Sequence, residues 1–217
     1  AENMGYEAIF FGESWGYDVV TILTLVALNT KHIKLGTGTV GIWARSPALM
    51  AQTAVSLHGI SSGRFILGLS SGNLALVENW HGTPVEKPVQ RIREYVEIMR
   101  MLWAGSPLEY HGQMFNMNGR FRLASKRVSG RIPIYIGSTG PRMNEQAGEI
   151  ADGWMPAHMD MKQFHIMLGD LERGARRIGR DVREIDIAPL IPACVCEDDQ
   201  EEHWARNKFK ENRAMYI

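Results

Sequence analysis

The sequence predicts an α/β fold built around a parallel sheet, either a (β/α)8 barrel or an open, doubly wound sheet. Two features of the 217-residue chain carry this prediction. Short apolar runs alternate with longer segments of helical periodicity, which is typical of βαβ units. Most of the short runs are apolar at every position, as strands covered on both faces should be.

Six strands and six helices follow from these patterns. The expected strands are residues 7–11, 32–36, 64–69, 132–136, 153–156 and 185–195. The expected helices are residues 18–29, 46–58, 88–103, 141–150 and 164–178, and one that begins near residue 198. Their starts are marked by capping or opening residues, such as Asp18 for the first helix and the Ser46–Pro47 pair for the second.

One segment, at about residues 106–131, interrupts the alternation. From residue 110 onward it is rich in glycine, asparagine and basic residues, with short aromatic alternation. We expect a hairpin insertion on one rim of the sheet, and long insertions of this kind are often functional. Six strands are fewer than a closed barrel needs, so a barrel formed by residues 1–217 is expected to be a single partial domain lacking its first and last strands.

Composition excludes several classes of function. With 24 basic and 24 acidic residues the formal net charge is zero, which argues against a nucleic-acid partner. No apolar run reaches the roughly 18 residues of a membrane span. Cys194 and Cys196 lie two apart in an expected strand, where we predict core packing rather than redox work, and no disulfide scaffold is expected. A cytoplasmic location is then the default.

The seven histidines show no metal-binding spacing, so no metal site is expected. His81 follows the end of an expected strand and is the histidine we single out for the functional face.

Residues 36–41 read Gly-Thr-Gly-Thr-Val-Gly, which matches the G-x-G-x-x-G pattern of dinucleotide-binding folds. In those folds the helix begins within the glycines, so that its N-terminus meets the pyrophosphate. Here residues 42–45 intervene before the Ser46–Pro47 helix start, and the next strand ends in Ser70–Ser71 without an acidic residue for the ribose. The motif is better explained as a strand end where something packs close to bare backbone.

Residues 68–72 read Gly-Leu-Ser-Ser-Gly, which matches the nucleophile elbow of serine hydrolases. A strand precedes the serine, and residues 73–80 have the length of a turn or two of helix. The acid–histidine partners that can be nominated for Ser70 are Asp152 with His158 and Asp186 with His203. A serine hydrolase therefore remains an alternative, beside a plain strand end of small residues lining a pocket.

A third motif is more telling, because Gly137, Ser138, Thr139 and Gly140 lie between an expected strand and the Pro141 helix start. Free backbone N–H groups at a helix N-terminus bind phosphate well, and barrels commonly place such a site after a late strand. The sequence predicts an anion site at this turn.

Several stretches, in this order, resemble the luciferase-like monooxygenase family, and most of all its branch that uses the deazaflavin coenzyme F420. They are residues 12–18 (GESWGYD), 33–38 (IKLGTG), 45–48 (RSPA), 57–68, 80–82 (WHG), 91–95 and 133–153. The resemblance covers nearly the whole chain. It implies a (β/α)8 barrel rather than an open sheet, with strands outside this chain at both ends.

The resemblance also implies site residues at the carboxyl ends of the strands. A non-proline cis peptide between Gly38 and Thr39 would form a bulge behind the cofactor ring. Ser71, Gly72 and Asn73 would contact the ring or its ribityl chain, and the turn at residues 137–140 would hold the phosphate. Glu13 and Ser14 would act at the substrate, although some dehydrogenase members carry a histidine base beside the acidic residue. On this basis Glu13, Gly38, Ser71, Gly137 and Pro156 should share one end of the sheet.

The implied activity is hydride transfer between coenzyme F420 and a small organic substrate, by a homodimer. FMN-dependent monooxygenation on the same barrel is an alternative, because both cofactors carry a phosphate and a tricyclic ring. A non-catalytic flavin-binding protein is a third possibility. The substrate does not follow from the sequence.

Overall fold

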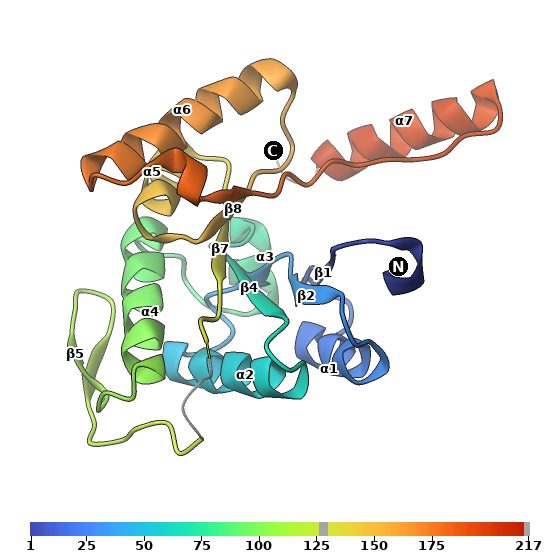
Figure 1. The fold of residues 1–217 in the computed structure, drawn as a ribbon. Coiled ribbons are helices and arrows are strands. Elements are labelled where there is room, and N and C mark those ends of the chain that lie inside the picture. The colour runs from blue at the N-terminus through green and yellow to red at the C-terminus, as the bar shows by residue number, and fades with distance from the viewer. Residues whose placement is uncertain (126–129, 215–217) are drawn as a thin grey trace.

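A computed structural model describes residues 1–125 and 130–214 of the chain, and within them a curved parallel sheet carries the helices (Figure 1). The strands run β1 (Ala8–Phe11), β2 (Lys34–Thr37), β4 (Phe65–Ser70), β7 (Ile134–Gly137), β8 (Gly153–Met155) and β9 (Asp186–Ile187), with the two-residue β3 (Val40–Gly41) paired to β4. The order across the sheet is the order along the chain. A doubly wound sheet reverses its strand order at a switch point, so this topology is that of a barrel, of which the described strands form a part.

The helices mostly begin within one residue of the predicted starts, but the one expected from residue 164 begins earlier, at Met161. They are α1 (Val19–Asn29), α2 (Pro47–Ile60), α3 (Leu74–Trp80), α4 (Pro88–Trp103), α5 (Pro141–Ile150), α6 (Met161–Arg177) and α7 (Asp199–Ala214), with 3-10 turns at Glu2–Met4 and Val182–Glu184. The Asp18 carboxylate accepts the N–H of Thr21 at 2.7 Å, and the Ser46 hydroxyl accepts that of Leu49 at 3.2 Å. These caps satisfy N–H groups that have no partner inside the helix.

Two strand predictions need correction. The strand expected at residues 32–36 is shifted, because β2 runs from Lys34 to Thr37. The strand expected at 185–195 is much shorter, since β9 covers two residues and the chain then pairs once more, at Leu190. Pro189 and Pro192 have no N–H for a ladder, which accounts for the early end.

The same irregular segment overturns the prediction for the cysteines. Cys194 is exposed and Cys196 is partly exposed, so neither packs in a core. Both thiols are free. Beyond this segment, α7 extends away from the rest of the chain (Figure 1).

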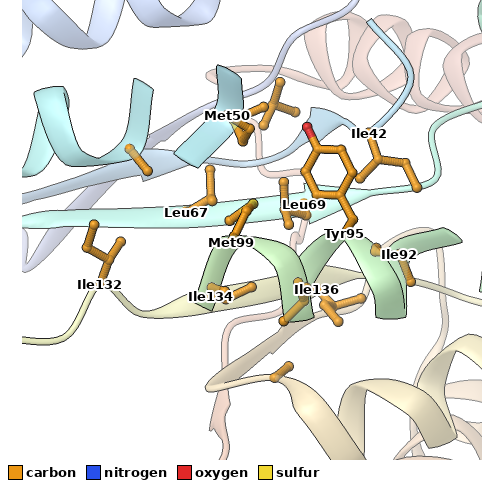
Figure 2. Close-up of a cluster of buried hydrophobic side chains, with 14 of the residues drawn as sticks. Ile42, Met50, Leu67, Leu69, Ile92, Tyr95, Met99, Ile132, Ile134 and Ile136 are labelled. Carbon is orange, nitrogen blue, oxygen red and sulfur yellow. The ribbon is translucent and has the colours of Figure 1, made fainter. Parts of the chain in front are cut away.

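The two faces of the sheet bury different side chains. On the outer face, alternate residues of β4 and β7 are almost fully buried against α2 and α4: Leu67, Leu69, Ile134 and Ile136 (Figure 2). On the inner face, Ile66, Tyr135 and Met155 form a separate cluster with Phe10. Because successive strand residues point to opposite faces, this alternation fixes the register of the strands.

A bulge separates β2 from β3 along the edge of β4. Gly36 pairs with Ile66 and Val40 pairs with Leu69, so four steps along one strand oppose three along the other. The extra residue lies where the Thr37 hydroxyl bonds both the N–H and the carbonyl of Gly68, at 2.8 and 2.7 Å. A bulge re-aims the chain that follows it, and here that chain enters the candidate site.

The expected insertion contains a hairpin, as predicted. Strands β5 (Glu109–His111) and β6 (Asn116–Asn118) pair antiparallel, whereas residues 126–129 of the insertion lie outside the described residues. The buried carboxylate of Glu94, on α4, accepts the N–H groups of Gln113, Met114 and Phe115 at 2.8–3.0 Å. One carboxylate thus holds the turn of the hairpin onto the helix.

Replacing Glu94 with glutamine should destabilise the protein by about 2 kcal/mol at pH 7, because an NH2 group then faces N–H donors. Burial by itself would raise the pKa of Glu94, but hydrogen bonds from Gln90 and the three N–H groups outweigh it and lower the pKa. The stability from a lowered carboxyl pKa is present above the unfolded value and is lost as the pH falls through the folded one. Urea unfolding from pH 7 to pH 3 should show the difference between the two proteins shrinking toward acid, and a constant difference would contradict this account.

Candidate functional site

The residues expected at one end of the sheet do lie there. All six main strands are parallel. Glu13, Gly38, Ser71 and Pro156 each follow the last residues of β1, β2, β4 and β8, and Gly137 is the last residue of β7. The carboxyl ends of barrel strands are where active sites form.

The peptide bond between Gly38 and Thr39 is cis, as predicted. The backbone around it is closely packed. The Gly38 N–H donates to the Phe11 carbonyl at 2.8 Å, and the Glu13 N–H donates to the Thr39 carbonyl at 3.0 Å. A Cβ at Gly12 would lie 3.2 Å from the Gly38 carbonyl oxygen. The segment after β1 therefore rests directly on the bulge.

Hydroxyl groups join the bulge to the end of β4. Thr39 Oγ1 donates to Ser70 Oγ at 2.7 Å, and the Gly72 N–H donates to the same oxygen at 3.3 Å. A Cβ at Gly137 would lie 2.7 Å from Thr39 Cγ2, so the next strand end also packs against this group. The ends of β2, β4 and β7 form one continuous surface.

The geometry does not support a triad at Ser70. The nominated acids lie at the opposite, amino-terminal end of the strands: the Asp152 carboxylate accepts the N–H of Ile134, and Asp186 pairs in register with Gly153 at the start of β8. A nucleophile and its base need to be within hydrogen-bond reach.

The dinucleotide motif fails as well, as expected. After the glycines the chain continues into β3 and reaches a helix only at Pro47, so no helix N-terminus lies within the motif.

A small cavity of about 40 Å³ opens at this end of the sheet. It is lined by Glu13, Gly41, Trp43, Ala44, Ser70, Gly72, Val77 and His81, so the histidine singled out from the sequence reaches the site. The volume suits about one water molecule, and the cavity is the floor of a site rather than a complete pocket for a tricyclic ring. A larger cavity of about 330 Å³, next to Arg100 and Arg131, precedes β7 and lies at the other end of the strands.

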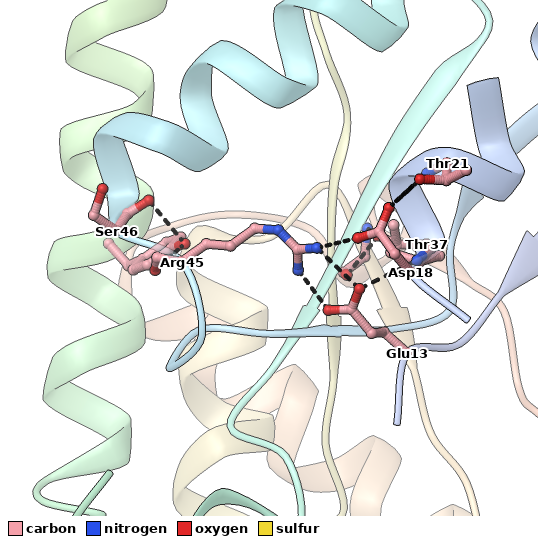
Figure 3. Close-up of polar contacts among 9 residues, drawn as sticks. Glu13, Asp18, Thr21, Thr37, Arg45 and Ser46 are labelled. Atoms are coloured by element: carbon pink, nitrogen blue, oxygen red, sulfur yellow. Dashed lines mark hydrogen bonds and ion pairs between the residues drawn. The ribbon is translucent and has the colours of Figure 1, made fainter. Parts of the chain in front are cut away.

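Glu13 is held by an ion-pair network that the sequence did not predict (Figure 3). Both carboxylate oxygens bond the Arg45 guanidinium, at 2.5 and 3.0 Å, and one also accepts the N–H of Val19 at the start of α1. Arg45 bonds Asp18 as well, at 2.6 Å. The hydrogen bonds to Glu13 raise the pKa of Arg45, so the cation is permanent. The Glu13 carboxylate is therefore fixed in position between Arg45 and the start of α1.

The wall of the cavity is stacked against the inserted hairpin. The Arg91 guanidinium lies between the Trp43 and Phe115 rings, at 4.6 and 4.8 Å from their centres. Trp43 donates its indole N–H to the Ser71 carbonyl at 2.7 Å. The contact between a cation and two ring faces is favourable. The insertion thus supports the wall of the site from behind.

The turn at residues 137–140 ends in an uncapped helix. Gly140 is the N-cap of α5, and no side chain among the described residues caps this helix. Within the described chain the N–H groups of Ser138, Thr139 and Gly140 donate to no other residue. A Cβ at Gly140 would meet no atom within 4 Å. The turn offers open space and unpaired donors.

The remaining predicted residues lie at the same end. Ser14 is exposed, and its hydroxyl bonds no other described residue. Asn73 precedes α3, and its carbonyl accepts the N–H of Val77 at 3.0 Å. Sequence reasoning missed Arg45 and also Asn144, a fully buried polar residue of α5 that bonds Ser138. A polar residue on the apolar stripe of a helix is the signal that would have found Asn144.

Across residues 1–125 and 130–214, no helix combines the length and the apolar character that crossing a membrane requires. Within the same ranges, no cluster of histidine, cysteine and carboxylate side chains is suited to a metal ion.

Comparison with known proteins gives one consistent result. The family model described as luciferase-like monooxygenase matches residues 1–216. The chain is 35% identical to the 5,10-methylenetetrahydromethanopterin reductase of Methanolobus tindarius over 189 residues, which are 87% of this chain and 57% of that protein. It is 34% identical to the enzyme of that name from Archaeoglobus fulgidus, over 95% of this chain and 60% of the relative.

A solved structure shows the same likeness. The coenzyme F420-dependent tetrahydromethanopterin reductase of Methanopyrus kandleri superposes with a TM-score of 0.84 at 30% identity, covering 92% of this chain and 61% of that one. The chain thus spans about three fifths of the length of the relatives it matches.

Proposed function

Because this chain belongs to the luciferase-like monooxygenase family, we propose that it forms the greater part of an oxidoreductase that transfers a hydride between coenzyme F420 and a small organic substrate. The observation that carries the proposal is the uncapped turn at residues 137–140, at the same sheet end as the bulge at Gly38–Thr39. The similarity to F420-dependent reductases supports the choice of cofactor.

The residues of the turn fit a phosphate. The N–H groups of Ser138, Thr139 and Gly140 are unpaired within the described chain, and the N-terminus of the ten-residue helix α5 adds its dipole. The Ser138 hydroxyl is not available to donate to a phosphate, since its proton is already donated to Asn144 Oδ1. We assign phosphate binding at Ser138 to its backbone.

The ring of the cofactor would lie at the ends of β2 and β4. Gly38 and Thr39 form the backbone surface there, and Ser71, Gly72 and Asn73 follow β4 with backbone and side-chain polar groups. When bound, a reduced deazaflavin supplies a hydride from a ring carbon. The protein orients the ring and excludes water. The wall formed by Trp43 is anchored for this purpose by its hydrogen bond to the Ser71 carbonyl.

Glu13 and Ser14 face the substrate in this proposal. Glu13 lines the cavity, but its carboxylate is engaged by Arg45 and the Val19 N–H, so we assign it an orienting role. Ser14 is exposed, with a hydroxyl that can bond a substrate.

We further assign the active protein to a homodimer in the cytoplasm. The exposed leucines of α1, Leu25 and Leu28, offer an apolar contact for a second copy, and the free cysteines fit a reducing compartment.

The cofactor assignment is tested by titrating the purified protein with coenzyme F420 and separately with FMN, following the fluorescence of each. We expect saturable binding of F420 and binding of FMN at least about tenfold weaker, a difference of about 1.4 kcal/mol. Tighter binding of FMN would replace the proposal with the monooxygenase alternative. Binding of neither cofactor would remove it.

A further inference from the structure

A chain of hydrogen bonds lies beneath the proposed phosphate turn. The Trp154 indole N–H donates to Ser138 Oγ at 3.0 Å, and the hydroxyl donates to Asn144 Oδ1 at 2.7 Å. Asn144 Nδ2 donates to Asp170 Oδ2 at 3.3 Å. The Asp170 carboxylate also pairs with Arg173. The chain runs from β8 through the turn and α5 to α6.

The direction of every bond in this chain is fixed by its two ends. An indole N–H can only donate, and an ionised carboxylate can only accept. Asn144 must therefore turn its NH2 group to Asp170 and its oxygen to Ser138. The Ser138 hydroxyl, which accepts from Trp154, must give its one proton to Asn144. The side chain of Ser138 has a single satisfactory arrangement, in which its hydroxyl bonds both Trp154 and Asn144.

Because the partners of Ser138 are buried, breaking these hydrogen bonds would cost free energy. Trp154 and Asn144 are fully buried, and Asp170 is 5% exposed. Water cannot replace a lost partner there, and buried polar groups need partners. Rotation of Ser138 would leave both the indole N–H and the Asn144 oxygen without a bond.

The two helices that carry Asn144 and Asp170 cannot slide. A Cβ at Gly174 would lie 1.7 Å from the Glu145 carbonyl oxygen, and one at Gly148 would lie 2.1 Å from that of Leu171. The backbones of α5 and α6 are therefore in contact. Ion pairs from Arg173 and Arg177 to Glu145 hold the crossing from outside.

We infer that Asn144 and Asp170 are positioning residues for the anion-binding turn, an inference that rests on the proposed function. They hold the Ser138 side chain inward, and so keep the backbone N–H groups of residues 138–140 fixed and free for the phosphate of the ligand. Neither residue touches the phosphate. The binding site is thus pre-organised by a network on its far side.

The first test replaces Asn144 with leucine, which has a similar volume and no polar atoms. Affinity for coenzyme F420, measured by fluorescence titration, should fall about tenfold or more. Inorganic phosphate, used as a competitor in the same titration, should lose affinity in parallel. The matched control is Gln146→Leu, since Gln146 lies on the same helix, is 3% exposed, and has an amide nitrogen without a partner among the described residues. The affinity of the Gln146→Leu protein for coenzyme F420 should stay within about twofold of that of the unchanged protein.

The second test guards against a variant that fails to fold. Asn144→Asp should weaken F420 binding, because a carboxylate then faces Asp170 where an NH2 group donated. The double variant Asn144→Asp/Asp170→Asn restores a donor opposite an acceptor but moves the carboxylate away from Arg173 and toward the turn, so affinity should recover in part, to above that of Asn144→Asp alone. A purely structural role would instead give affinities that follow the thermal midpoint of each variant.

Two results separate this inference from the proposed function. If the unchanged protein binds neither F420 nor FMN, the proposed function fails. If it binds F420 and Asn144→Leu binds as tightly as Gln146→Leu, or if the double variant shows no recovery, the proposed function stands and the positioning role is overturned.

Discussion

Replacing Gly140 with valine should weaken binding of coenzyme F420 about 30- to 150-fold, which corresponds to about 2–3 kcal/mol. The new side chain would occupy the space beside the unpaired N–H groups, where the phosphate must approach. Folding should not change, because Gly140 has φ −86° and ψ 145°, a region that valine prefers, and its Cβ would meet no atom within 4 Å. Fluorescence titration of the variant, with its thermal midpoint measured beside it, gives both quantities.

The matched control is Gly59→Val. Gly59 also has open space around the position of a Cβ, but it lies near the end of α2, away from the carboxyl ends of the strands. The Gly59→Val protein should bind coenzyme F420 with unchanged affinity.

The Ser70→Ala variant tests the hydrolase alternative. If the Gly140 variant bound cofactor normally, and ester hydrolysis were present and abolished only by Ser70→Ala, the assignment as an oxidoreductase would be wrong.

Replacing Arg45 with methionine should destabilise the protein by about 2–3 kcal/mol. Removing one partner of a fully buried ion pair costs about 3–5 kcal/mol, and this pair is slightly exposed, with 15% of each side chain accessible in Arg45 and Glu13. Methionine keeps most of the apolar stem of the arginine side chain, so the loss of stability reports mainly the removal of the guanidinium charge. Urea unfolding of Arg45→Met, Glu13→Gln and the double variant should give a coupling energy of at least about 1 kcal/mol. Additive effects would show that the pair contributes nothing specific.

The loss of stability in Arg45→Met should become smaller at acid pH. Burial would raise the pKa of Asp18, but the hydrogen bonds from Thr21, followed by the charge of Arg45, outweigh it and lower the pKa. A carboxylate with a lowered pKa contributes stability above its unfolded pKa and loses it as the pH falls through the folded value. The difference between the unchanged protein and Arg45→Met should therefore narrow below about pH 4.

The fold could be predicted where local chemistry determines it. Asp18 and Ser46 signal helix starts because a capping bond spans only three residues. The last strand was overestimated for the opposite reason. Residues 188–195 are as apolar as a strand, and whether they pair depends on donors that Pro189 and Pro192 lack. The two-residue β3 depends on the register against β4, which no local pattern encodes.

The candidate site divides in the same way. The positions of Glu13, Gly38 and Gly137 follow from the ends of strands, and the structure gathers them at one edge. The partner of Glu13 could not be predicted, because Arg45 lies 32 residues away in the sequence. Asn144 and Asp170 depend on the packing of α5 against α6. Long-range polar pairs are a property of the assembled fold.

The glycines around the site differ in what restricts them. At Gly68 and Gly137 a methyl group would collide with Thr37 or Thr39, at 2.0 and 2.7 Å, so these positions are restricted by the folding of the chain alone. Gly140 has open space around the position of a Cβ, so under the proposed function it is the approaching phosphate that would restrict this residue. Conservation of glycine among relatives would therefore indicate close packing at positions 68 and 137, and ligand binding at position 140. If the phosphate binds at this turn, a relative that no longer binds the cofactor would be free to vary at Gly140, whereas Gly68 and Gly137 would stay fixed.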